Sequence, residues 1–201
     1  MNIILSTRNL SKTLQIQTVF AGLYVNIMTL EQAGITGEAV EDGDTLAANS
    51  YKKASFALQK TTQKQWCMAD DTGVFIDALD GAPGIHAARW AGDVWTEEIM
   101  QYTLDKLQDV PPSERGASFK TVAILLDPKG ESHIFTGELR GTILEAPRVP
   151  CQPNMPYSAI FQPNGHDKTW AEMTTEEENA ISHRGQAFSK MRGFLKTVVN
   201  I

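Results

Sequence analysis

Short apolar runs and helical stripes alternate along the first part of the chain. Residues 2–6 and 24–30 are short apolar runs typical of buried strands. Between these runs, apolar side chains recur at helical spacing at Ile16, Val19, Phe20 and Leu23. They predict a helix that stops near Gly22. A second helix is predicted from a cap at Asp44 or Thr45 to about Lys60, after a polar loop at residues 31–44. Its apolar stripe consists of Ala47, Tyr51, Ala54 and Leu58.

Two apolar runs, residues 66–69 and 74–76, flank the sequence Asp70-Asp71-Thr72-Gly73. Because Asp, Thr and Gly are common in turns, the two runs are expected to be the strands of a hairpin, with both carboxylates at its mouth. Ionised groups leave bulk water only when something compensates them, such as a cation, a metal or a raised pKa. The stretch is therefore either an Asp-rich turn or the centre of a chemical site.

The second half of the chain is richer in strands. A hairpin is predicted from residues 117–126 and 132–139 around a turn at residues 127–130, and it is extended by residues 141–145. A loop is expected at residues 80–84, and a helix is expected from a cap at Thr96 to about residue 108. An irregular Pro-rich segment is expected at residues 147–163. The last helix is expected at residues 182–200, with the stripe Ala187, Met191, Leu195 and Val198. The pattern indicates one α/β domain over residues 1–201, with two lobes and a β-rich lobe at roughly 115–165.

Composition and charge restrict the class of protein. With 201 residues, 42% hydrophobic and 21% charged, the chain has the make-up of a globular protein. The net charge of −6 argues against nucleic acid as a partner, although a small phosphorylated ligand needs only a few local cations. The longest clean apolar run, residues 122–126, is too short to span a membrane, and the short apolar start predicts no signal peptide. A soluble, cytoplasmic protein is expected.

Polar residues directly after the first strand form the first candidate site. A strand-to-helix turn presents free backbone N–H groups and the positive end of the helix dipole, which suit phosphate. Ser6, Thr7, Asn9 and Lys12 would add hydrogen-bond donors there. The segment has no Gly-x-x-x-x-Gly-Lys sequence, so it is not a P-loop. The alternative is that these residues only cap a helix and leave a lysine on the surface.

Two further segments complete a possible nucleotide site. Glu41 lies ahead of a predicted helix and, with Asp70 and Asp71, could supply oxygen ligands for Mg²⁺. His183 and Arg184, at the start of the last helix, could hold an anionic or acceptor-bearing part of a ligand. Both segments could instead be ordinary charged residues at helix starts. Together, the cations, carboxylates and N–H donors favour a nucleoside triphosphate site.

The chain resembles the inosine triphosphate pyrophosphatase family, whose members hydrolyse deaminated purine nucleoside triphosphates. The matching segments run nearly end to end: Ser6-Thr7-Arg8-Asn9 with Lys12; Glu41-Asp42-Gly43-Asp44-Thr45 with Asn49 and Lys53; Ala69-Asp70-Asp71-Thr72-Gly73; Gly81-Ala82-Pro83-Gly84 with Ala88-Arg89-Trp90-Ala91-Gly92; Ala171-Glu172-Met173; and Ile181-Ser182-His183-Arg184-Gly185-Gln186-Ala187. The resemblance implies an elongated mixed β-sheet with flanking helices, two lobes around a central nucleotide cleft, and a homodimer.

The same resemblance implies Mg²⁺-dependent cleavage of a nucleoside triphosphate to the monophosphate and pyrophosphate. Asp71 would be the general base that activates water, and Glu41 with Asp70 or Asp71 would hold Mg²⁺. Positioned charge does most of the work in such a reaction. The implied substrate-binding residues in the matching segments are Ser6, Thr7, Arg8, Asn9, Lys12, Lys53, Thr72, His183 and Arg184.

The chain departs from the family where the base is expected to be read. The family's loop reads Phe-Gly-Tyr/Trp-Asp-Pro, whereas this chain has Met155-Pro156-Tyr157-Ser158-Ala159, and the usual lysine five residues before His183 is Glu178. We therefore expect removal of the non-standard purines ITP, dITP and XTP with an altered base preference. Two alternatives are a catalytically silent nucleotide-binding protein and a phosphohydrolase that acts on a non-purine substrate.

Overall fold

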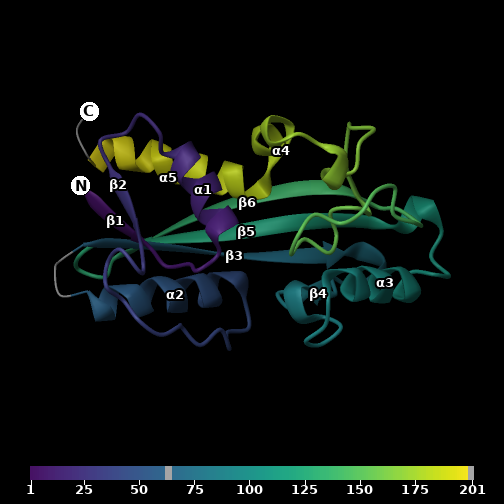
Figure 1. Cartoon of the computed structure of the whole chain (residues 1–201), viewed down its shortest axis with the longest axis horizontal. Coiled ribbons are helices and arrows are strands. Elements are labelled where there is room, and N and C mark those ends of the chain that lie inside the picture. Colours follow the sequence, from purple (N-terminus) through teal and green to yellow (C-terminus); the bar gives the residue numbers. More distant parts are fainter. Residues whose placement is uncertain (62–64, 199–201) are drawn as a thin grey trace. The chain divides into compact units, whose positions relative to one another are not determined.

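The computed structural model describes residues 1–61 and 65–198, which form two compact units (Figure 1). The first unit consists of Met1–Thr72, Thr121–Gly137 and the described part of His183–Ile201. The second unit consists of Gly73–Lys120 and Glu138–Ser182. Residues 115–165, which were expected to form one β-rich lobe, contribute to both units. No helix in the described part of the chain is long and apolar enough to cross a membrane.

A seven-stranded mixed sheet contributes strands to both units, in the order β2-β1-β3-β5-β6-β7, with β4 paired to β3. The strands are β1 (Asn2–Leu5), β2 (Asn26–Thr29), β3 (Trp66–Ile76), β4 (Pro83–Gly84), β5 (Gly116–Leu126), β6 (Ser132–Ile143) and β7 (Phe161–Pro163). β1 is parallel to both β2 and β3, with Ile4 opposite Met28 and Cys67. β4 and β7 pair antiparallel to β3 and β6. The predicted hairpin of β5 and β6 is confirmed.

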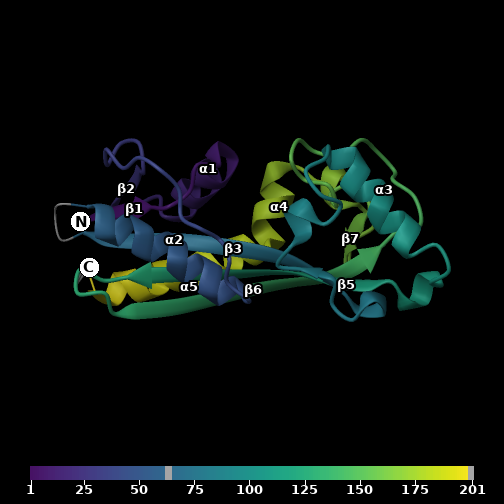
Figure 2. The same ribbon diagram turned by 90° about the horizontal axis from the view of Figure 1, so that it is seen from below.

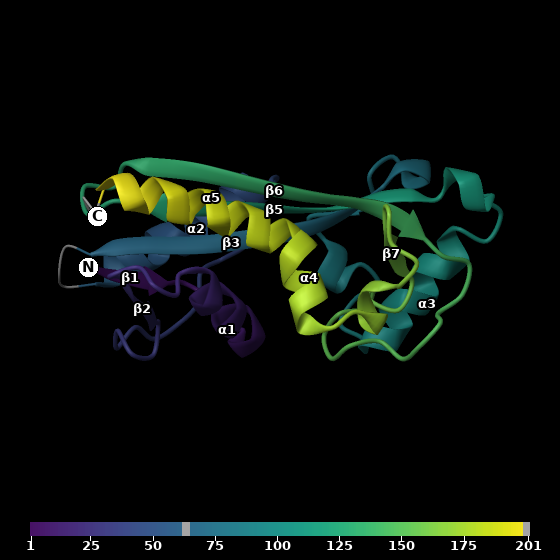
Figure 3. The ribbon, with the colours of Figure 1, turned by 90° about the horizontal axis from the view of Figure 1, so that it is seen from above.

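Helices cover both faces of the sheet in the first unit. The α-helices of the chain are α1 (Leu10–Val19), α2 (Leu46–Lys60), α3 (Thr96–Lys106), α4 (Thr175–Ile181) and α5 (His183–Val198). Side chains of α1 and α5 pack with Ile3 and Leu5 of β1, and α5 follows β5 and β6 (Figure 3). On the opposite face, α2 packs with Ile4 and Cys67 (Figure 2). Adjacent residues of β1 thus point into different cores, as strand geometry requires.

The core of the second unit is built by α3 with parts of β3, β5, β6 and β7. Its buried side chains include Ile76, Ile99, Ile143, Phe161 and Trp170. The third helix begins at Thr96 with Trp95 in the capping position, so the expected cap at Thr96 was wrong by one residue. The short helix α4 was not predicted.

The expected hairpin at Asp70-Asp71-Thr72-Gly73 was wrong, because these residues lie inside the single long strand β3. A turn is unnecessary because cations of the first unit compensate both carboxylates where they stand. Gly73 allows a close approach of two strands rather than a turn: a Cβ there would lie 2.7 Å from the carbonyl oxygen of Gly84, which lies opposite the next residue, Val74. Residue types that are typical of turns therefore led to a wrong prediction at this position, which is a buried strand whose charges are compensated.

The predicted helices at residues 45–60 and 182–200 exist, but their buried faces differ from the expected apolar stripes. Tyr51 is 47% exposed, whereas the polar residues Asn49 and Ser50 are buried on α2. Ser50 is buried because its Oγ donates to the carbonyl oxygen of Val122 at 2.6 Å. Val198 is 39% exposed, and the expected end of the last helix at residue 200 lies outside the described residues.

Candidate functional site

The start of α1 is organised by its own side chains. Asn9 caps the helix, with Oδ1 accepting from the backbone N–H of Lys12 at 3.0 Å. Thr7 Oγ1 accepts from the backbone N–H of Asn9 at 3.2 Å, and the N–H of Ser6 continues the sheet by donating to Met68. These bonds fix the chain as it leaves β1, so the N-terminal turn of α1 is presented in one conformation.

Asp70 is a buried carboxylate held by two cations. Its Oδ2 lies 3.1 Å from Lys12 Nζ of α1 and 3.2 Å from Arg184 Nε of α5. Burial alone would raise the pKa of Asp70, but the nearby positive charges of Lys12, Arg184 and Lys53 lower it well below its usual range. Asp70 Oδ1 is buried and accepts no hydrogen bond from any described residue. Burial in turn lowers the pKa of Lys12, partly opposed by Asp70.

Asp71 belongs to a separate charge cluster against α2. Its Oδ1 lies 2.9 Å from Lys53 Nζ, and that ammonium also lies 3.0 Å from Glu41 Oε2. Asn49 Nδ2 donates to Asp71 Oδ2 at 3.3 Å. Burial would lower the pKa of Lys53, but Asp71, Asp70 and Glu41 raise it overall, so this ammonium keeps its charge. One lysine therefore joins two predicted metal ligands.

The predicted metal ligands Glu41, Asp70 and Asp71 are not brought together as one cluster. Asp70 and Asp71 are neighbours in β3, so their side chains point to opposite faces of the sheet, one toward α1 and α5 and the other toward α2. Across residues 1–61 and 65–198, no group of three or more His, Cys, Asp or Glu side chains is placed to hold a metal ion. Glu41 and Asp71 remain the pair that shares a cation.

His183 and Arg184 reach β3 from the first turn of α5. Arg184 binds Asp70 and also donates through Nη1 to Gln15 Oε1 at 3.0 Å. His183 Nδ1 lies 2.7 Å from Thr121 Oγ1, a buried hydroxyl of β5. Burial, together with the charge of Arg184, holds the pKa of His183 well below its usual range. Sequence reasoning missed Thr121, because the sequence does not distinguish its hydroxyl from that of Ser118 in the same strand.

Two predicted binding residues lie apart from these contacts. Arg8 is exposed and donates to the carbonyl oxygen of Gly37 at 2.7 Å, with Glu38 Oε1 at 3.3 Å. Ser6 is buried at the end of β1. The structure therefore brings together Asn9, Lys12, Lys53, Thr72, His183 and Arg184 around the two aspartates, and it turns Arg8 toward the loop at residues 37–38.

The predicted base-reading residues Met155, Tyr157, Ser158 and Glu178 all belong to the second unit. Ser158 Oγ donates to the carbonyl oxygen of Met155 at 2.7 Å and accepts from the N–H of Gln152 at 2.9 Å. Tyr157 is buried, and its hydroxyl donates to the carbonyl oxygen of Ala87 at 2.9 Å. The hydroxyl groups of Ser158 and Tyr157 are thus hydrogen-bonded to the backbone of this unit.

Glu178 is half-buried and does not point freely into solvent. Gln152 Nε2 donates to its Oε1 at 2.6 Å. Burial raises the pKa of Glu178, and hydrogen bonds from Gln152 and Trp170 partly oppose that rise. Gln152 was not singled out from the sequence, yet it is hydrogen-bonded to three of the positions at which the chain departs from the family pattern: Met155, Ser158 and Glu178.

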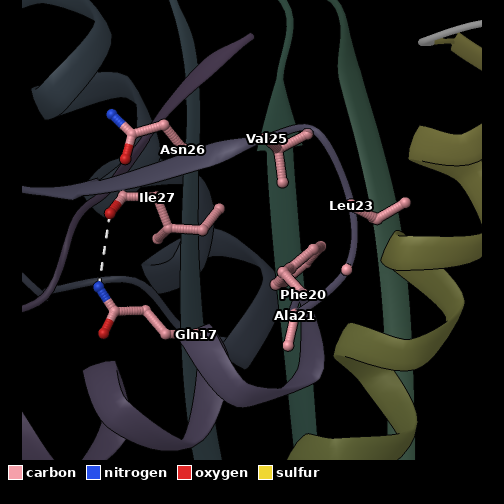
Figure 4. A pocket seen from close by; sticks show the side chains of 8 residues that line it. Gln17, Phe20, Ala21, Leu23, Val25, Asn26 and Ile27 are labelled. Atoms are coloured by element: carbon pink, nitrogen blue, oxygen red, sulfur yellow. Dashed lines mark hydrogen bonds between the residues drawn. The ribbon is translucent and has the colours of Figure 1, made fainter.

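A shallow cavity of about 300 Å³ in the first unit lies away from these residues (Figure 4). It is lined by the end of α1 and the segment leading into β2, and Gln17 Nε2 donates across it to the carbonyl oxygen of Ile27 at 3.4 Å. None of the candidate site residues lines this cavity. The residues that line it carry no ionisable side chain.

Comparison with known proteins matches this chain nearly end to end. Residues 3–194 match the model of the Ham1 family. A dITP/XTP pyrophosphatase of Clostridium perfringens is 37% identical over 201 residues, which cover 98% of each chain. The structure of a HAM1 protein from Coxiella burnetii superposes with a TM-score of 0.88 at 32% identity, covering 98% of this chain and 99% of that one. A nucleoside-triphosphatase / dITP/XTP pyrophosphatase from Mycobacterium abscessus has a TM-score of 0.76 at 33% identity, covering 95% and 98%.

Proposed function

Because the chain belongs to the Ham1 family, we propose that it hydrolyses nucleoside triphosphates to the monophosphate and pyrophosphate, with ITP, dITP and XTP as substrates. The observation that carries this proposal is the gathering of Lys12, Lys53 and Arg184 around Asp70 and Asp71, beside the capped start of α1. Several cations and free N–H groups around carboxylates suit a polyphosphate that must be both bound and attacked by water. The names of its relatives in Clostridium perfringens and Mycobacterium abscessus agree with this chemistry.

In the proposed reaction, Lys12, Lys53 and Arg184 bind phosphate oxygens, and Asp71 accepts the proton of the attacking water. Asn49 donates to one oxygen of the Asp71 carboxylate and Lys53 to the other, so the carboxylate is oriented before the substrate binds. Asp70 keeps its negative charge and so holds Lys12 and Arg184 in place. Positioned charge of this kind lowers the barrier because it needs no rearrangement during the reaction.

The substrate range is tested with a panel of ITP, dITP, XTP and the standard nucleoside triphosphates in Mg²⁺, with pyrophosphate release measured. Release from ITP, dITP and XTP at the highest kcat/KM is the expected result. Binding of these nucleotides without any release would establish the silent binder, and turnover confined to other phosphorylated compounds would establish a different phosphohydrolase. Either outcome contradicts the proposal.

The cofactor we propose is Mg²⁺, held by Glu41 and Asp71. Their carboxylates already converge on one cation, Lys53 Nζ, and hard oxygen donors are the ligands that Mg²⁺ prefers. Asp70 faces Lys12 and Arg184 instead, so it is not part of this pair of ligands. When bound, Mg²⁺ would draw negative charge from the phosphate oxygens and favour loss of pyrophosphate.

Glu41→Gln is expected to raise the Mg²⁺ concentration for half-maximal rate by at least about 10-fold, because a neutral amide is a poorer ligand for a hard cation. The measurement is a Mg²⁺ titration of pyrophosphate release at saturating ITP. Glu31→Gln, on the same loop and exposed, is the matched control and should leave the titration unchanged. An unchanged titration in Glu41→Gln would make Glu41 a structural partner of Lys53 only.

We also propose that Glu178 alters the base preference. A 6-keto purine presents an oxygen acceptor, which a carboxylate repels and which a lysine would bind. Glu178→Lys is therefore expected to raise the kcat/KM preference for ITP over ATP by about 5- to 150-fold. Glu176→Lys, an exposed glutamate on the same helix, makes the same charge change as a control. A strong native ITP preference that Glu178→Lys leaves unchanged would assign base reading to other groups.

The assembly and compartment that we propose are a homodimer in the cytoplasm. The support for the dimer is the family resemblance, together with large apolar side chains that are exposed in each unit, such as Leu10 in the first and Trp95 in the second. Sedimentation equilibrium of the purified chain measures its mass directly. A single species at the monomer mass of 22.2 kDa would contradict the dimer.

A further inference from the structure

A continuous chain of hydrogen-bonding groups joins Arg184 to His183 through two threonines of the sheet. Arg184 Nη2 donates to Thr72 Oγ1 at 3.4 Å, and Thr72 Oγ1 lies 2.7 Å from Thr121 Oγ1. Thr121 Oγ1 in turn lies 2.7 Å from His183 Nδ1. Thr121 is fully buried and His183 is 5% exposed, so these groups exchange little with solvent. The chain of bonds connects β3, β5 and α5 within the first unit.

The donors and acceptors in this chain of bonds have a preferred direction. A guanidinium group only donates, so the Thr72 oxygen accepts from Arg184. If the Thr72 hydroxyl then donates to Thr121, the Thr121 hydroxyl is left to donate to His183 Nδ1. In the opposite direction the Thr72 oxygen would accept twice, and its own hydrogen would need an acceptor outside the chain. The direction from Arg184 to His183 therefore places every hydrogen between two of these groups, and it makes Nδ1 an acceptor.

The surroundings of His183 keep the ring neutral. Burial lowers its pKa well below the usual range, and the charges of Arg184 and Lys12 lower it further, against the opposing charge of Asp70. A neutral imidazole carries one N–H, so a ring that accepts at Nδ1 donates at Nε2. The environment and the hydrogen-bond direction thus agree on one tautomer.

The backbone of His183 is fixed independently of its ring. A Cβ at Gly137 would lie 1.9 Å from the carbonyl oxygen of His183, so β6 and the first turn of α5 approach as closely as a glycine allows. With the backbone held there, the orientation of the imidazole depends on its side-chain torsions. The Thr121 hydroxyl is the contact at Nδ1 that restrains those torsions.

We propose that Thr121 is a positioning residue that holds His183 as the neutral tautomer with its proton on Nε2. The side of the ring away from Thr121 is then a hydrogen-bond donor, suited to an oxygen or nitrogen acceptor of the nucleotide. This part of the inference rests on the proposed function, because His183 belongs to its substrate-binding residues. Thr121 itself touches no substrate and acts through His183.

The test combines nitrogen NMR of the whole protein, which distinguishes the imidazole tautomers, with steady-state kinetics on ITP. The chain has four histidines, and the His183 signals are assigned by their loss in His183→Gln. The wild type should show a neutral His183 with its proton on Nε2. Thr121→Val, which keeps the shape and removes the hydroxyl, should shift the ring toward the other tautomer and raise KM about 2- to 10-fold, the loss of one hydrogen bond. Thr121→Ser should restore both readouts.

Thr103→Val is the matched control, because Thr103 is equally buried and its hydroxyl donates to a backbone carbonyl in the second unit. It should leave the His183 signals unchanged. A wild-type His183 with its proton on Nδ1, or a Thr121→Val ring that keeps the wild-type tautomer, would overturn the proposal. The NMR result stands without turnover, so failure of every nucleotide as a substrate would reject the proposed function separately.

Discussion

Asp71→Asn is expected to lower kcat for pyrophosphate release from ITP by about 10²- to 10⁴-fold, the usual loss when a general base is removed. An amide keeps the size of the carboxylate and one acceptor oxygen, but it cannot take a proton from water. Lys12 and Arg184 bind Asp70 rather than Asp71, so the fold and nucleotide binding should be largely retained. Calorimetric titration with a nucleotide and initial rates of pyrophosphate release measure the two effects separately.

The control for this variant is Asp77→Asn. Asp77 is an exposed carboxylate of the second unit, paired with Arg140, so the substitution removes a salt bridge that includes none of the candidate site residues. Its kcat should match the wild type. Near-normal kcat in Asp71→Asn would remove Asp71 from the role of base and leave it as the partner of Lys53 and Asn49.

Asp70→Asn is expected to lower the free energy of unfolding by about 3–5 kcal/mol at neutral pH, the usual cost of breaking a buried ion pair from one side. Its carboxylate is the shared counter-charge of Lys12 and Arg184, and neither cation has another carboxylate partner among the ion pairs of the described residues. Urea unfolding monitored by fluorescence measures the change. Asp77→Asn again serves as control and should cost no more than about 1 kcal/mol, because its ion pair is exposed.

The pH dependence of that difference follows from the direction of the pKa shift. The pKa of Asp70 is lower in the folded protein than its ordinary value of 3.8, so the unfolded chain binds the proton more readily. The stabilisation is fully present above pH 3.8 and is lost as the pH falls toward the folded pKa. Wild type and Asp70→Asn should therefore converge in stability in acid. If the free energies of unfolding of wild type and Asp70→Asn differ by the same amount down to pH 2, the charge of Asp70 is not what stabilises the fold.

Regular periodicity made most of the fold predictable, because a strand or helix with one buried apolar face has apolar residues at a characteristic spacing in the sequence. The strand predicted at residues 2–6 is found at Asn2–Leu5, and the hairpin of β5 and β6 is confirmed. The second helix was predicted with a cap at Asp44 or Thr45, and Thr45 caps it. Polar residues that enter the interior were not predictable in this way. Asn49 and Ser50 are buried because each has a specific partner, and that partner lies in a distant part of the sequence.

The site was predictable in its composition but not in its geometry. The sequence indicated that Asp70 and Asp71 need compensation by a cation, a metal or a raised pKa, and in the structure Lys12, Arg184 and Lys53 lie against them. The hairpin expected at Asp70 and Asp71 would have placed both carboxylates together at its mouth, whereas the continuous strand β3 points them to opposite faces. Thr121 and Gln152 stayed hidden because a hydroxyl in a strand and an amide in a Pro-rich loop carry no signal until their partners are known.

The continuity of β3 through Asp70 and Asp71 divides the two carboxylates between two chemical environments. Since neighbours in a strand alternate between faces, a shift of β3 by a single residue would turn each carboxylate to the opposite face of the sheet. Asp70 would then leave Lys12 and Arg184, and Asp71 would leave Lys53 and Asn49. Strand pairing between β1 and β3, which sets Leu5 opposite Met68, thereby keeps each aspartate on the face of the sheet where its cations lie.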